Sequence, residues 1–276
     1  MNSDTLFNFK NGIRMMLGLF AGLLVVAGIS ACDTSNSSTD TTGTFEIRMH
    51  DAPTDELAEV NVHVLEVHVQ HSSNGWVTVG EPDGIYNLLD LVNGNIVMLG
   101  ENEVEGGRYN QIRLILGENN LVVNHDGETF ELKTPSAQQS GLKMNINSDL
   151  EEGVRYVLVL DFDASKSIVR TGNSPVQDYI LKPVIRAYEE ALTGTISGTI
   201  VPSLSMSRID AMVADTVYTS TYAGTNGEFL LIGLEPITYS VQVHARVGEY
   251  SVMSITGVDV EAGARTELGE LELLIE

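Results

Sequence analysis

The sequence predicts an all-β protein in which two β-sandwich domains follow one another. Short segments with alternating apolar and polar residues recur along the chain, as at residues 45–49, and such alternation is typical of half-buried strands. Two-residue turn signals, Asn74-Gly75 and Asp126-Gly127, separate some of these segments. Many short strands with turns between them favour a β-sandwich over a fold that mixes helices and strands.

Individual strands follow from the same alternation. The apolar residues of 60–64 share one parity, but the parity changes at Leu65, which predicts a β-bulge or a strand buried on both faces. Residues 76–79 return from the first turn signal as the second strand of a hairpin. Helical turns are expected only at residues 54–58 and 87–91. Further strands are expected at residues 111–116, 121–123, 130–132, 154–162 and 179–186.

The N-terminal segment has the features of a secretory signal peptide. Lys10 and Arg14 precede an uncharged, largely apolar run at residues 15–31. A basic start, an apolar middle and small residues at the cleavage site are typical of such a signal. The alternative is a retained transmembrane helix, which needs about 20 apolar residues. The run is shorter than that and ends in small residues, so we expect residues 1–31 to be removed.

Cys32 is the only cysteine of the chain, and it directly follows Ile29, Ser30 and Ala31. This order of an aliphatic residue, two small residues and a cysteine resembles the lipobox of bacterial lipoproteins. The resemblance implies that Cys32 is acylated and becomes the mature N-terminus, and several acyl chains anchor a protein stably where one does not. We therefore expect a membrane-anchored lipoprotein of the cell envelope, facing the periplasm or the cell surface, with the outer membrane favoured over the inner.

A flexible tether is expected next, at residues 32–43. Residues 33–42 contain no apolar side chain, and such a tract cannot bury enough surface to fold. Two β-sandwich domains are expected to follow, at residues 44–190 and 191–276. The boundary is placed where Glu189 and Glu190 interrupt one strand pattern before Gly194 begins another.

The chain is strongly acidic, with a formal net charge of −23. Removal of the signal peptide makes the charge one unit more negative, because that segment carries two cations and one anion. A surface of this sign repels phosphate backbones, which excludes nucleic acid as an expected partner. With Cys32 acylated no disulfide can form, so both domains must be stabilised by packing alone.

Six blocks between about residues 44 and 188 are similar to one family, the domain of unknown function numbered 4382. The family occurs on secreted proteins and lipoproteins of bacteria and archaea, and the resemblance implies no particular activity. The blocks are residues 50–53; 86–91 with 93 and 94; 109 with 111–114; 135, 136 and 138–143; 160–164 with 166–168; and 181–186.

The second unit, from Thr193 onward, resembles the carboxypeptidase regulatory-like domains. These are small transthyretin-like sandwiches that are grouped with carbohydrate-binding-like folds. The resemblance rests on the Gly-x-Ile-x-Gly opening at residues 194–198 and on Asn226-Gly227, where a hairpin is expected before Phe229. No long strand is expected between residues 202 and 217. The resemblance implies a spacer or stabilising domain, and sugar binding would be an analogy of fold alone.

Three aspartates are the candidate metal ligands. Alternation along a strand puts Asp161 and Asp163 on one side, roughly 6 to 7 Å apart, and Phe162 on the other. Like charges at that distance raise each other's proton affinity unless a cation lies between them. A calcium ion could bind there, with Asp51 as a further ligand. The alternative is structural: a salt bridge to Lys166, Lys182 or Arg186, or capping of the loop that begins at Ala164.

Three aromatic residues, Trp76, Tyr86 and Tyr109, are the candidate ligand platform. Sugar rings stack on exposed aromatic side chains, although aromatic residues more often belong to the core. The histidines are expected to face solvent from strands. His63 and His71 lie eight residues apart, roughly 26 Å along an extended strand, too far apart to share an ion.

The predicted function is a non-catalytic binding or structural module of the cell envelope, with a glycan or a surface protein as its partner. The sequence contains no Gly-x-Ser-x-Gly, no His-Glu-x-x-His and no phosphate-binding glycine loop. We therefore predict no catalytic residues. The alternative function is a carboxylate-based enzyme of unrecognised type, with or without a divalent cation at the three aspartates.

Overall fold

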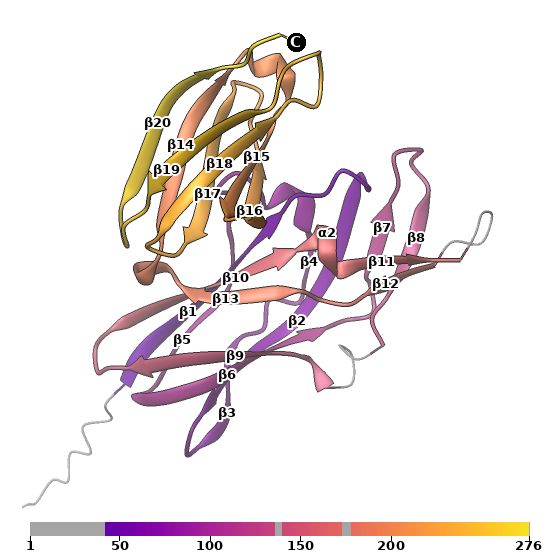
Figure 1. Cartoon of the computed structure of the whole chain (residues 1–276). Helices are drawn as coiled ribbons and strands as arrows, with labels where there is room; N and C mark the ends of the chain where they lie inside the picture. The colour runs from indigo at the N-terminus through magenta and orange to yellow at the C-terminus, as the bar shows by residue number, and fades with distance from the viewer. Residues whose placement is uncertain (1–41, 136–139, 173–177, 276) are drawn as a thin grey trace, which may run out of the picture. The chain divides into compact units, whose positions relative to one another are not determined.

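The computed structural model describes residues 42–135, 140–172 and 178–275. Within these ranges the chain belongs to one compact unit built almost entirely of strands (Figure 1), which confirms the all-β prediction. No helix in these ranges is both long and apolar enough to cross a membrane. The predicted signal peptide, Cys32 and nearly all of the predicted tether lie outside the described residues.

The strands up to β13 form two sheets. One sheet has the strand order β13-β10-β1-β5, and the other has the order β11-β12-β8-β7-β2-β6-β9, with β3 and β4 each paired to β2. The strands are β1 (Thr42–Ala52), β2 (Glu59–His71), β3 (Gly75–Gly80), β4 (Gly84–Asn87), β5 (Val97–Glu105), β6 (Gly107–Leu116), β7 (Leu121–Val123), β8 (Thr129–Lys133), β9 (Leu142–Leu150), β10 (Arg155–Asp163), β11 (Ile168–Thr171), β12 (Asp178–Leu181) and β13 (Ile185–Glu189), with the short helices η1 (Leu88–Asp90), α2 (Ala164–Ser167) and η2 (Glu190–Leu192).

The remaining strands form two further sheets, coloured orange to yellow in Figure 1. Their orders are β17-β14-β20 and β16-β15-β18-β19, and β14 and β20 are parallel neighbours. The strands are β14 (Gly194–Val201), β15 (Arg208–Val213), β16 (Thr216–Tyr222), β17 (Glu228–Leu234), β18 (Thr238–His244), β19 (Met253–Asp259) and β20 (Arg265–Glu272), and the short helix η3 spans Ser203–Ser205.

Each pair of sheets has a hydrophobic core of its own. Phe45, Ile47 and Met49 alternate along β1, have no exposed surface and belong to the first core. Tyr239 and Val241 of β18 are equally inaccessible in the second. Burial of such a side chain contributes about 1.5 to 3 kcal/mol relative to exposure. The alternation that predicted the strands therefore also selects the face of each strand that packs inside a sandwich.

The predicted bulge and turns are confirmed. All five valines of β2 are fully buried although their parity changes, because the register of β2 against β6 shifts between Val64 and Glu66. The bulge turns the second half of the strand so that its apolar side chains also face the core. Gly75 and Gly127 adopt positive φ angles of 81° and 79° at the predicted turns, a conformation that glycine adopts without steric cost.

Two local expectations are wrong. The strand expected at residues 179–186 is divided into β12 and β13, which lie in different sheets. Pro183 stands between them, and its missing N–H cannot complete a ladder in the middle of a strand. Residues 54–58 contain no helical turn, whereas residues 87–91 do contain η1, and the side chain of Asn87 accepts a hydrogen bond from the backbone N–H of Leu89.

The hairpin expected at Asn226-Gly227 is also wrong. The turn is present, since the Gly224 N–H donates to the Glu228 carbonyl at 2.8 Å, but β16 and β17 lie in different sheets. The turn therefore carries the chain from one sheet to the other. β17 pairs instead with β14, where a Cβ at Gly198 would stand 2.8 Å from the ring of Phe229. This close approach explains the second glycine of the Gly-x-Ile-x-Gly opening.

The domain boundary near residue 190 stays a prediction, and its test is a shortened chain. Residues 43–190 keep the whole first core, so we expect them to fold alone and to unfold cooperatively on heating. The midpoint should lie below that of the full chain, because contacts to β16 and β17 are lost. Circular dichroism in the near and far ultraviolet, followed during heating, measures the cooperativity of unfolding and its midpoint. Aggregation or non-cooperative melting that is reversed only by adding back residues 191–276 would show one indivisible domain.

Candidate functional site

A row of polar side chains crosses three strands of the first sheet. β10 pairs with β1 on one side and with β13 on the other, so His50 lies opposite Asp161, and Asp161 lies opposite Arg186. The preceding residues on β1 and β10, Met49 and Leu160, are fully buried in the first core. Alternation therefore directs the row to the opposite face of the sheet.

The members of this row form ion pairs and hydrogen bonds. Arg186 Nη2 lies 2.8 Å from Asp161 Oδ2, and Arg186 Nε lies 3.3 Å from the same oxygen. His50 Nε2 lies 3.0 Å from the hydroxyl of Tyr188 and 3.7 Å from Asp161 Oδ1. His50 and Asp161 are only 4% and 7% exposed, so they interact mainly with protein atoms rather than with water.

Tyr218 of β16 covers the row from the second sandwich. Arg186 Nη1 donates a hydrogen bond to the Tyr218 hydroxyl, and the guanidinium lies 4.5 Å from the centre of the Tyr218 ring. The same guanidinium lies 4.9 Å from the centre of the Tyr188 ring. Both distances are those of cation–π contacts. We call His50, Asp161, Arg186, Tyr188 and Tyr218 the Arg186 cluster.

Burial determines the protonation of the cluster. It lowers the pKa of His50, and the positive charge of Arg186 also lowers it, although Asp161 acts in the opposite direction. His50 is therefore neutral at pH 7. Burial and the charge of Asp161 raise the pKa of Tyr188, so its phenol stays protonated. The charges left in the cluster are the buried Asp161 and the partly buried Arg186, which form an ion pair.

Asp51 does not join the other two aspartates. It follows His50 on β1 and lies opposite Phe162, so alternation places it on the inner face of the sheet. Its Oδ1 accepts a hydrogen bond from the Ala164 N–H at 2.9 Å, and the residue is 2% exposed. Burial raises the pKa of Asp51 well above its usual value, and the nearby charges of Asp161 and Asp163 act in the same direction.

Asp163 caps the short helix α2. Its Oδ1 accepts hydrogen bonds from the Lys166 N–H at 3.0 Å and from the Ser165 hydroxyl at 2.6 Å, and Lys166 Nζ lies 2.7 Å from its Oδ2. Partial burial alone would raise the pKa of Asp163, but these hydrogen bonds lower it. The structural alternative for the aspartates is thus confirmed: Asp163 caps a loop and pairs with Lys166, and Asp161 pairs with Arg186.

The calcium hypothesis receives no support from this geometry. Phe162 is fully buried and opposite in parity to Asp161 and Asp163, as predicted, but Asp51 faces the other side of the sheet. In the described ranges no three histidine, aspartate, glutamate or cysteine side chains are arranged to hold a metal ion. Burial, which raises the pKa of Asp51, disfavours its ionised form and so weakens it as a ligand for Ca²⁺, which prefers ionised or carbonyl oxygens.

The three aromatic candidates do not form one platform. Tyr109 is fully buried, packs edge-to-face on Phe45 at 4.8 Å between ring centres, and donates a hydrogen bond to the Glu105 carbonyl at 2.7 Å. Trp76 and Tyr86 lie opposite positions of β2 eight residues apart, Gln70 and Val62. That separation is about 26 Å along the strand. Trp76 and Tyr86 are both partly exposed, so each remains accessible on its own.

The expectation that histidines face solvent is wrong for three of them. His50, His68 and His71 are each less than 9% exposed. His71 Nδ1 accepts hydrogen bonds from the backbone N–H groups of Ser73 and Asn74, at 3.2 and 3.1 Å, and so stabilises the turn of the first hairpin. Histidine has a polar edge that can satisfy local backbone groups while its ring is buried, and the sequence pattern does not reveal this.

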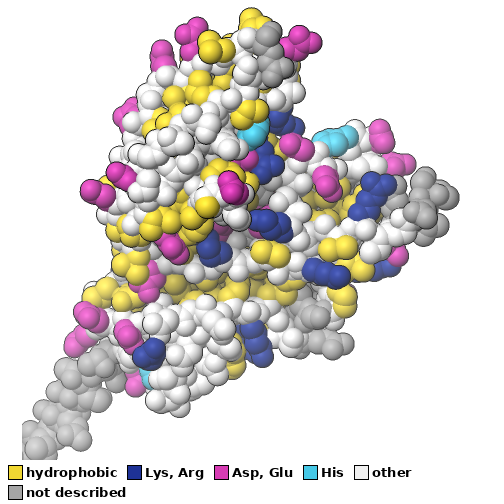
Figure 2. Space-filling model, viewed as in Figure 1, with side chains coloured by type: hydrophobic (Ala, Val, Ile, Leu, Met, Phe, Trp, Pro, Cys, Tyr) yellow, Lys and Arg dark blue, Asp and Glu magenta, His cyan; other side chains and the backbone are white. Residues whose placement is uncertain are grey.

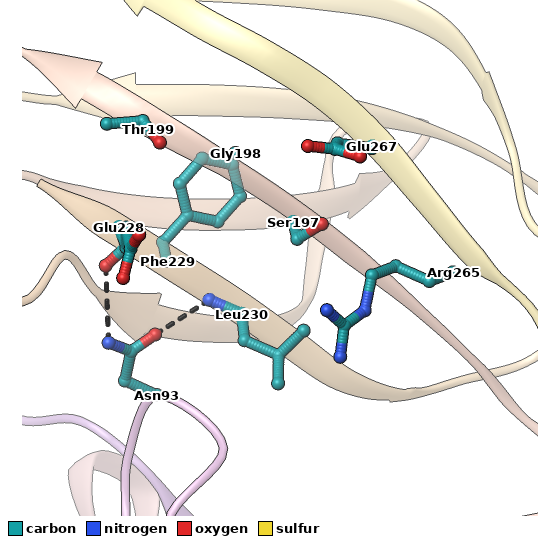
Figure 3. A pocket seen from close by; sticks show the side chains of 9 residues that line it. All are labelled: Asn93, Ser197, Gly198, Thr199, Glu228, Phe229, Leu230, Arg265 and Glu267. Atoms are coloured by element: carbon teal, nitrogen blue, oxygen red, sulfur yellow. Dashed lines mark hydrogen bonds between the residues drawn. The ribbon is translucent and has the colours of Figure 1, made fainter.

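A second polar site lies on the outer face of the β17-β14-β20 sheet, where a cavity of about 320 Å³ opens (Figure 3). Asn93, from the loop between η1 and β5, reaches this sheet. Its Oδ1 accepts from the Leu230 N–H at 2.7 Å, and its Nδ2 donates to the Glu228 carbonyl at 3.2 Å. The cavity is lined by Asn93, Ser197, Gly198, Thr199, Glu228, Phe229, Leu230, Arg265 and Glu267.

The amide of Asn93 acts as one peptide unit added to the free edge of β17. The backbone N–H of Asn93 donates to Thr221 Oγ1 at 2.9 Å, so the residue contacts strands of both sheets in the second sandwich. The turn conformation supports this contact: Asn93 and Gly94 have φ angles of 55° and 80°, and a Cβ at Gly94 would stand 2.7 Å from the side chain of Leu230. The Asn-Gly dipeptide predicts a turn at this position. The sequence does not indicate that the turn contacts β17.

The structure thus defines a class of protein: an all-β chain of two sandwiches that are joined through buried and partly buried polar side chains. The family model of the domain of unknown function DUF4382 matches residues 42–183. This match covers more than half of the chain, and the chain belongs to that family. Three of the blocks recognised in the sequence, residues 50–53, 160–164 and 181–186, supply His50, Asp161 and Arg186 of the cluster. Part of another block, residues 136–139, lies outside the described residues.

Comparison with curated proteins finds no match. Solved structures with a partial likeness include the TIE protein of Bacillus anthracis, at 11% identity and a TM-score of 0.24 over 84% of this chain and 34% of that one. BcpA, the major pilin subunit of Bacillus cereus, is 10% identical with a TM-score of 0.26, over 85% of this chain and 100% of that one. The shaft pilin SpaA from Lactobacillus rhamnosus GG is 7% identical with a TM-score of 0.21, over 86% of this chain and 98% of that one. This chain spans about a third of the B. anthracis protein. At such TM-scores we draw nothing about function from the likeness.

The Arg186–Asp161 pair should be important for stability. Replacing the arginine, Arg186→Gln, leaves Asp161 buried without its cation, which we expect to lower the free energy of unfolding by about 3 kcal/mol. Urea denaturation measures this loss. Arg170→Gln is the control, since Arg170 is exposed and should change stability by no more than about 0.5 kcal/mol. A loss no larger than that of the control would contradict the role of the pair.

The raised pKa of Asp51 predicts a pH dependence. A group whose pKa is raised on folding stabilises the protein fully below its unfolded pKa, near 3.8, and this stabilisation is lost as the pH rises through the folded pKa. Asp51→Asn keeps the acceptor for Ala164 but cannot ionise. Its stability relative to the wild type should therefore increase as the pH is raised above about 4.

Urea denaturation at a series of pH values checks this dependence. Asp51→Ala is the matched variant: it leaves the buried Ala164 N–H without its acceptor and should cost about 1 to 3 kcal/mol even at acidic pH. A constant difference between Asp51→Asn and the wild type across the pH range would mean that Asp51 ionises normally.

Proposed function

We propose that this protein is a lipid-anchored, non-catalytic module of the cell envelope that presents its two sandwiches as one rigid body. The observation that carries the proposal is that polar side chains of the first sandwich contact the second. Arg186 contacts Tyr218, and Asn93 contacts β17, so an arginine and an asparagine of the first sandwich join it to the second. A rigid unit of this kind suits a spacer or a presenting scaffold.

A binding or structural role fits the chemistry of the Arg186 cluster better than catalysis does. A general base must be accessible to its substrate and have a pKa near the working pH. His50 is almost inaccessible and has a lowered pKa, while Asp161 is held by Arg186. Asp51 is buried and has a raised pKa. These groups therefore serve folding, and no specific observation favours the carboxylate-based enzyme.

The second sandwich, β14 to β20, we propose to be a carboxypeptidase regulatory-like domain. Its two small sheets and the glycine-dependent packing of β14 on β17 agree with the motif that suggested the resemblance. In this proposal it extends and stabilises the family domain. The polar cavity of Figure 3, with the hydroxyls of Ser197 and Thr199, gives a place for a hydroxyl-rich ligand.

The charge of the surface limits the partners. Acidic side chains are distributed over the face seen in Figure 2 rather than gathered in one patch. Together with the net charge of −23 this supports solubility in the envelope and opposes binding to nucleic acid. We propose a glycan or a neighbouring envelope protein as the partner, and the outer membrane rather than the inner as the location.

The anchor is tested by replacing its only thiol. Cys32→Ser should release the protein from the membrane fraction or leave a larger precursor, because serine cannot carry the thioether lipid. Cell fractionation and gel mobility measure both effects, and a density gradient separates the inner from the outer membrane. Ser35→Ala, a change in the same segment that leaves Cys32 in place, is the control. If Cys32→Ser fractionates and migrates like the wild type, the protein is not a lipoprotein.

A further inference from the structure

We propose that the outer face of the large sheet binds an acidic polysaccharide at a site formed by Trp76, Gln111, Arg113, Lys143 and Asn145, which we call the Trp76 face. This inference rests on the glycan-binding part of the proposed function and makes it specific. It moves the site from the three aromatic residues expected from the sequence to one of them, Trp76, and adds residues of β6 and β9.

The Trp76 face is built by the registers of four neighbouring strands. β3, β2, β6 and β9 lie side by side, and one row across them runs from Trp76 through Gln70 and Gln111 to Asn145. The core-facing neighbours of this row include Val69 and Ile112, which are fully buried. The row therefore faces away from the core. With strands about 4.8 Å apart, it spans about 14 Å, which suits a short stretch of polymer.

Two cations lie directly opposite each other on this face. Arg113 of β6 pairs with Lys143 of β9 in the strand register. Like charges at opposed positions are destabilising unless an anion compensates them. Neither side chain has a carboxylate within 4.0 Å in the described ranges, and the segments outside them between residues 136 and 177 contain no acidic residue. The nearby Glu66 pairs with His68 at 2.7 Å.

The guanidinium of Arg113 is held for recognition. It lies 4.5 Å from the centre of the Trp76 ring, and because its Nε is buried, a ligand would be bound by its two Nη groups. Lys143 Nζ lies 6.0 Å from the same ring centre. A guanidinium stacked on an aromatic ring keeps its planar set of donors in a fixed orientation, which matches a carboxylate or a sulfate. What distinguishes these two cations is that the strand register places them opposite each other, in a chain whose net charge is −23.

The amides beside the cations point to a hydroxyl-rich ligand. Gln111 Nε2 donates to Asn145 Oδ1 at 3.0 Å, and Gln70 lies next to Gln111 in the row. Amides both donate and accept hydrogen bonds, as sugar hydroxyls do. A nucleic acid carries about one charge per 1.7 Å of duplex, and the acidic remainder of the surface would repel so dense a polyanion. A polysaccharide with more widely spaced acidic groups offers hydroxyls to the amides and anionic groups to the two cations, at a charge density that the acidic surface repels less.

The test is affinity electrophoresis of the full chain in gels that contain polygalacturonate, dextran sulfate with few sulfates per sugar, or neutral dextran. We expect retardation by the carboxylated or the sulfated polymer, or by both, weakened by added salt, and none by neutral dextran. The polymer that retards the protein shows whether the site binds a carboxylate, a sulfate or both. Arg113→Gln with Lys143→Gln should weaken binding by about tenfold or more, because charge-assisted hydrogen bonds are lost.

The matched control is Arg170→Gln with Lys182→Gln, which removes the same charge from two exposed residues elsewhere. It should bind like the wild type. Thermal unfolding checks the fold: the Arg113/Lys143 variant should still unfold cooperatively, because it loses the repulsion between the two cations together with their contacts to the Trp76 ring. Absence of retardation by both acidic polymers, equal retardation by neutral dextran, or an equal loss in the control would overturn the proposal. None of these outcomes affects the anchor, which the Cys32→Ser experiment tests separately.

Discussion

The parallel pairing of β1 with β10 is the constraint on which the rest of the structure depends. Parallel neighbours need a long connection, and here that connection contains every strand from β2 to β9 and so builds most of the second sheet. The same pairing places His50 beside Asp161 and leaves the other side of β10 free for β13 and Arg186. A shift of one residue would turn Asp161 into the core and Phe162 out of it.

Polar side chains make several of the contacts between the two sandwiches, and this has a physical consequence. A buried ion pair gains little net stability, because desolvation offsets most of its attraction, but a mismatched arrangement would leave charges unpaired. Arg186 with Tyr218, Asn93 with the edge of β17, and Asp55 with Arg246 at 2.8 Å therefore select one arrangement. Asn93 also occupies hydrogen-bonding groups of an edge strand that could otherwise pair with another chain.

Much of the secondary structure was accessible from the sequence, and the failures have identifiable causes. β9 was not among the predicted strands, although its residues alternate between apolar and polar and the sequence therefore contained the signal. β15 was obscured because Asp210, buried between Ile209 and Ala211, interrupts the apolar pattern, and its neighbours Arg208 and His244 pair with it only in the folded sheet. The turn at Asn226-Gly227 was recognised, but the local signal does not say that its two strands belong to different sheets.

The sequence by itself determined the all-β class, the acidic charge, the family, the N-terminal lipoprotein prediction and the opposite orientations of Asp161 and Phe162. Tertiary structure alone decided that Arg186 is the partner of Asp161, that Asp51 lies across the sheet from the other aspartates, and that Arg113 meets Lys143 beside Trp76. The physical reason is the range of the interactions. Alternation is a property of one strand and repeats every second residue, whereas the neighbour of a side chain depends on which distant strand pairs with its own and in which register.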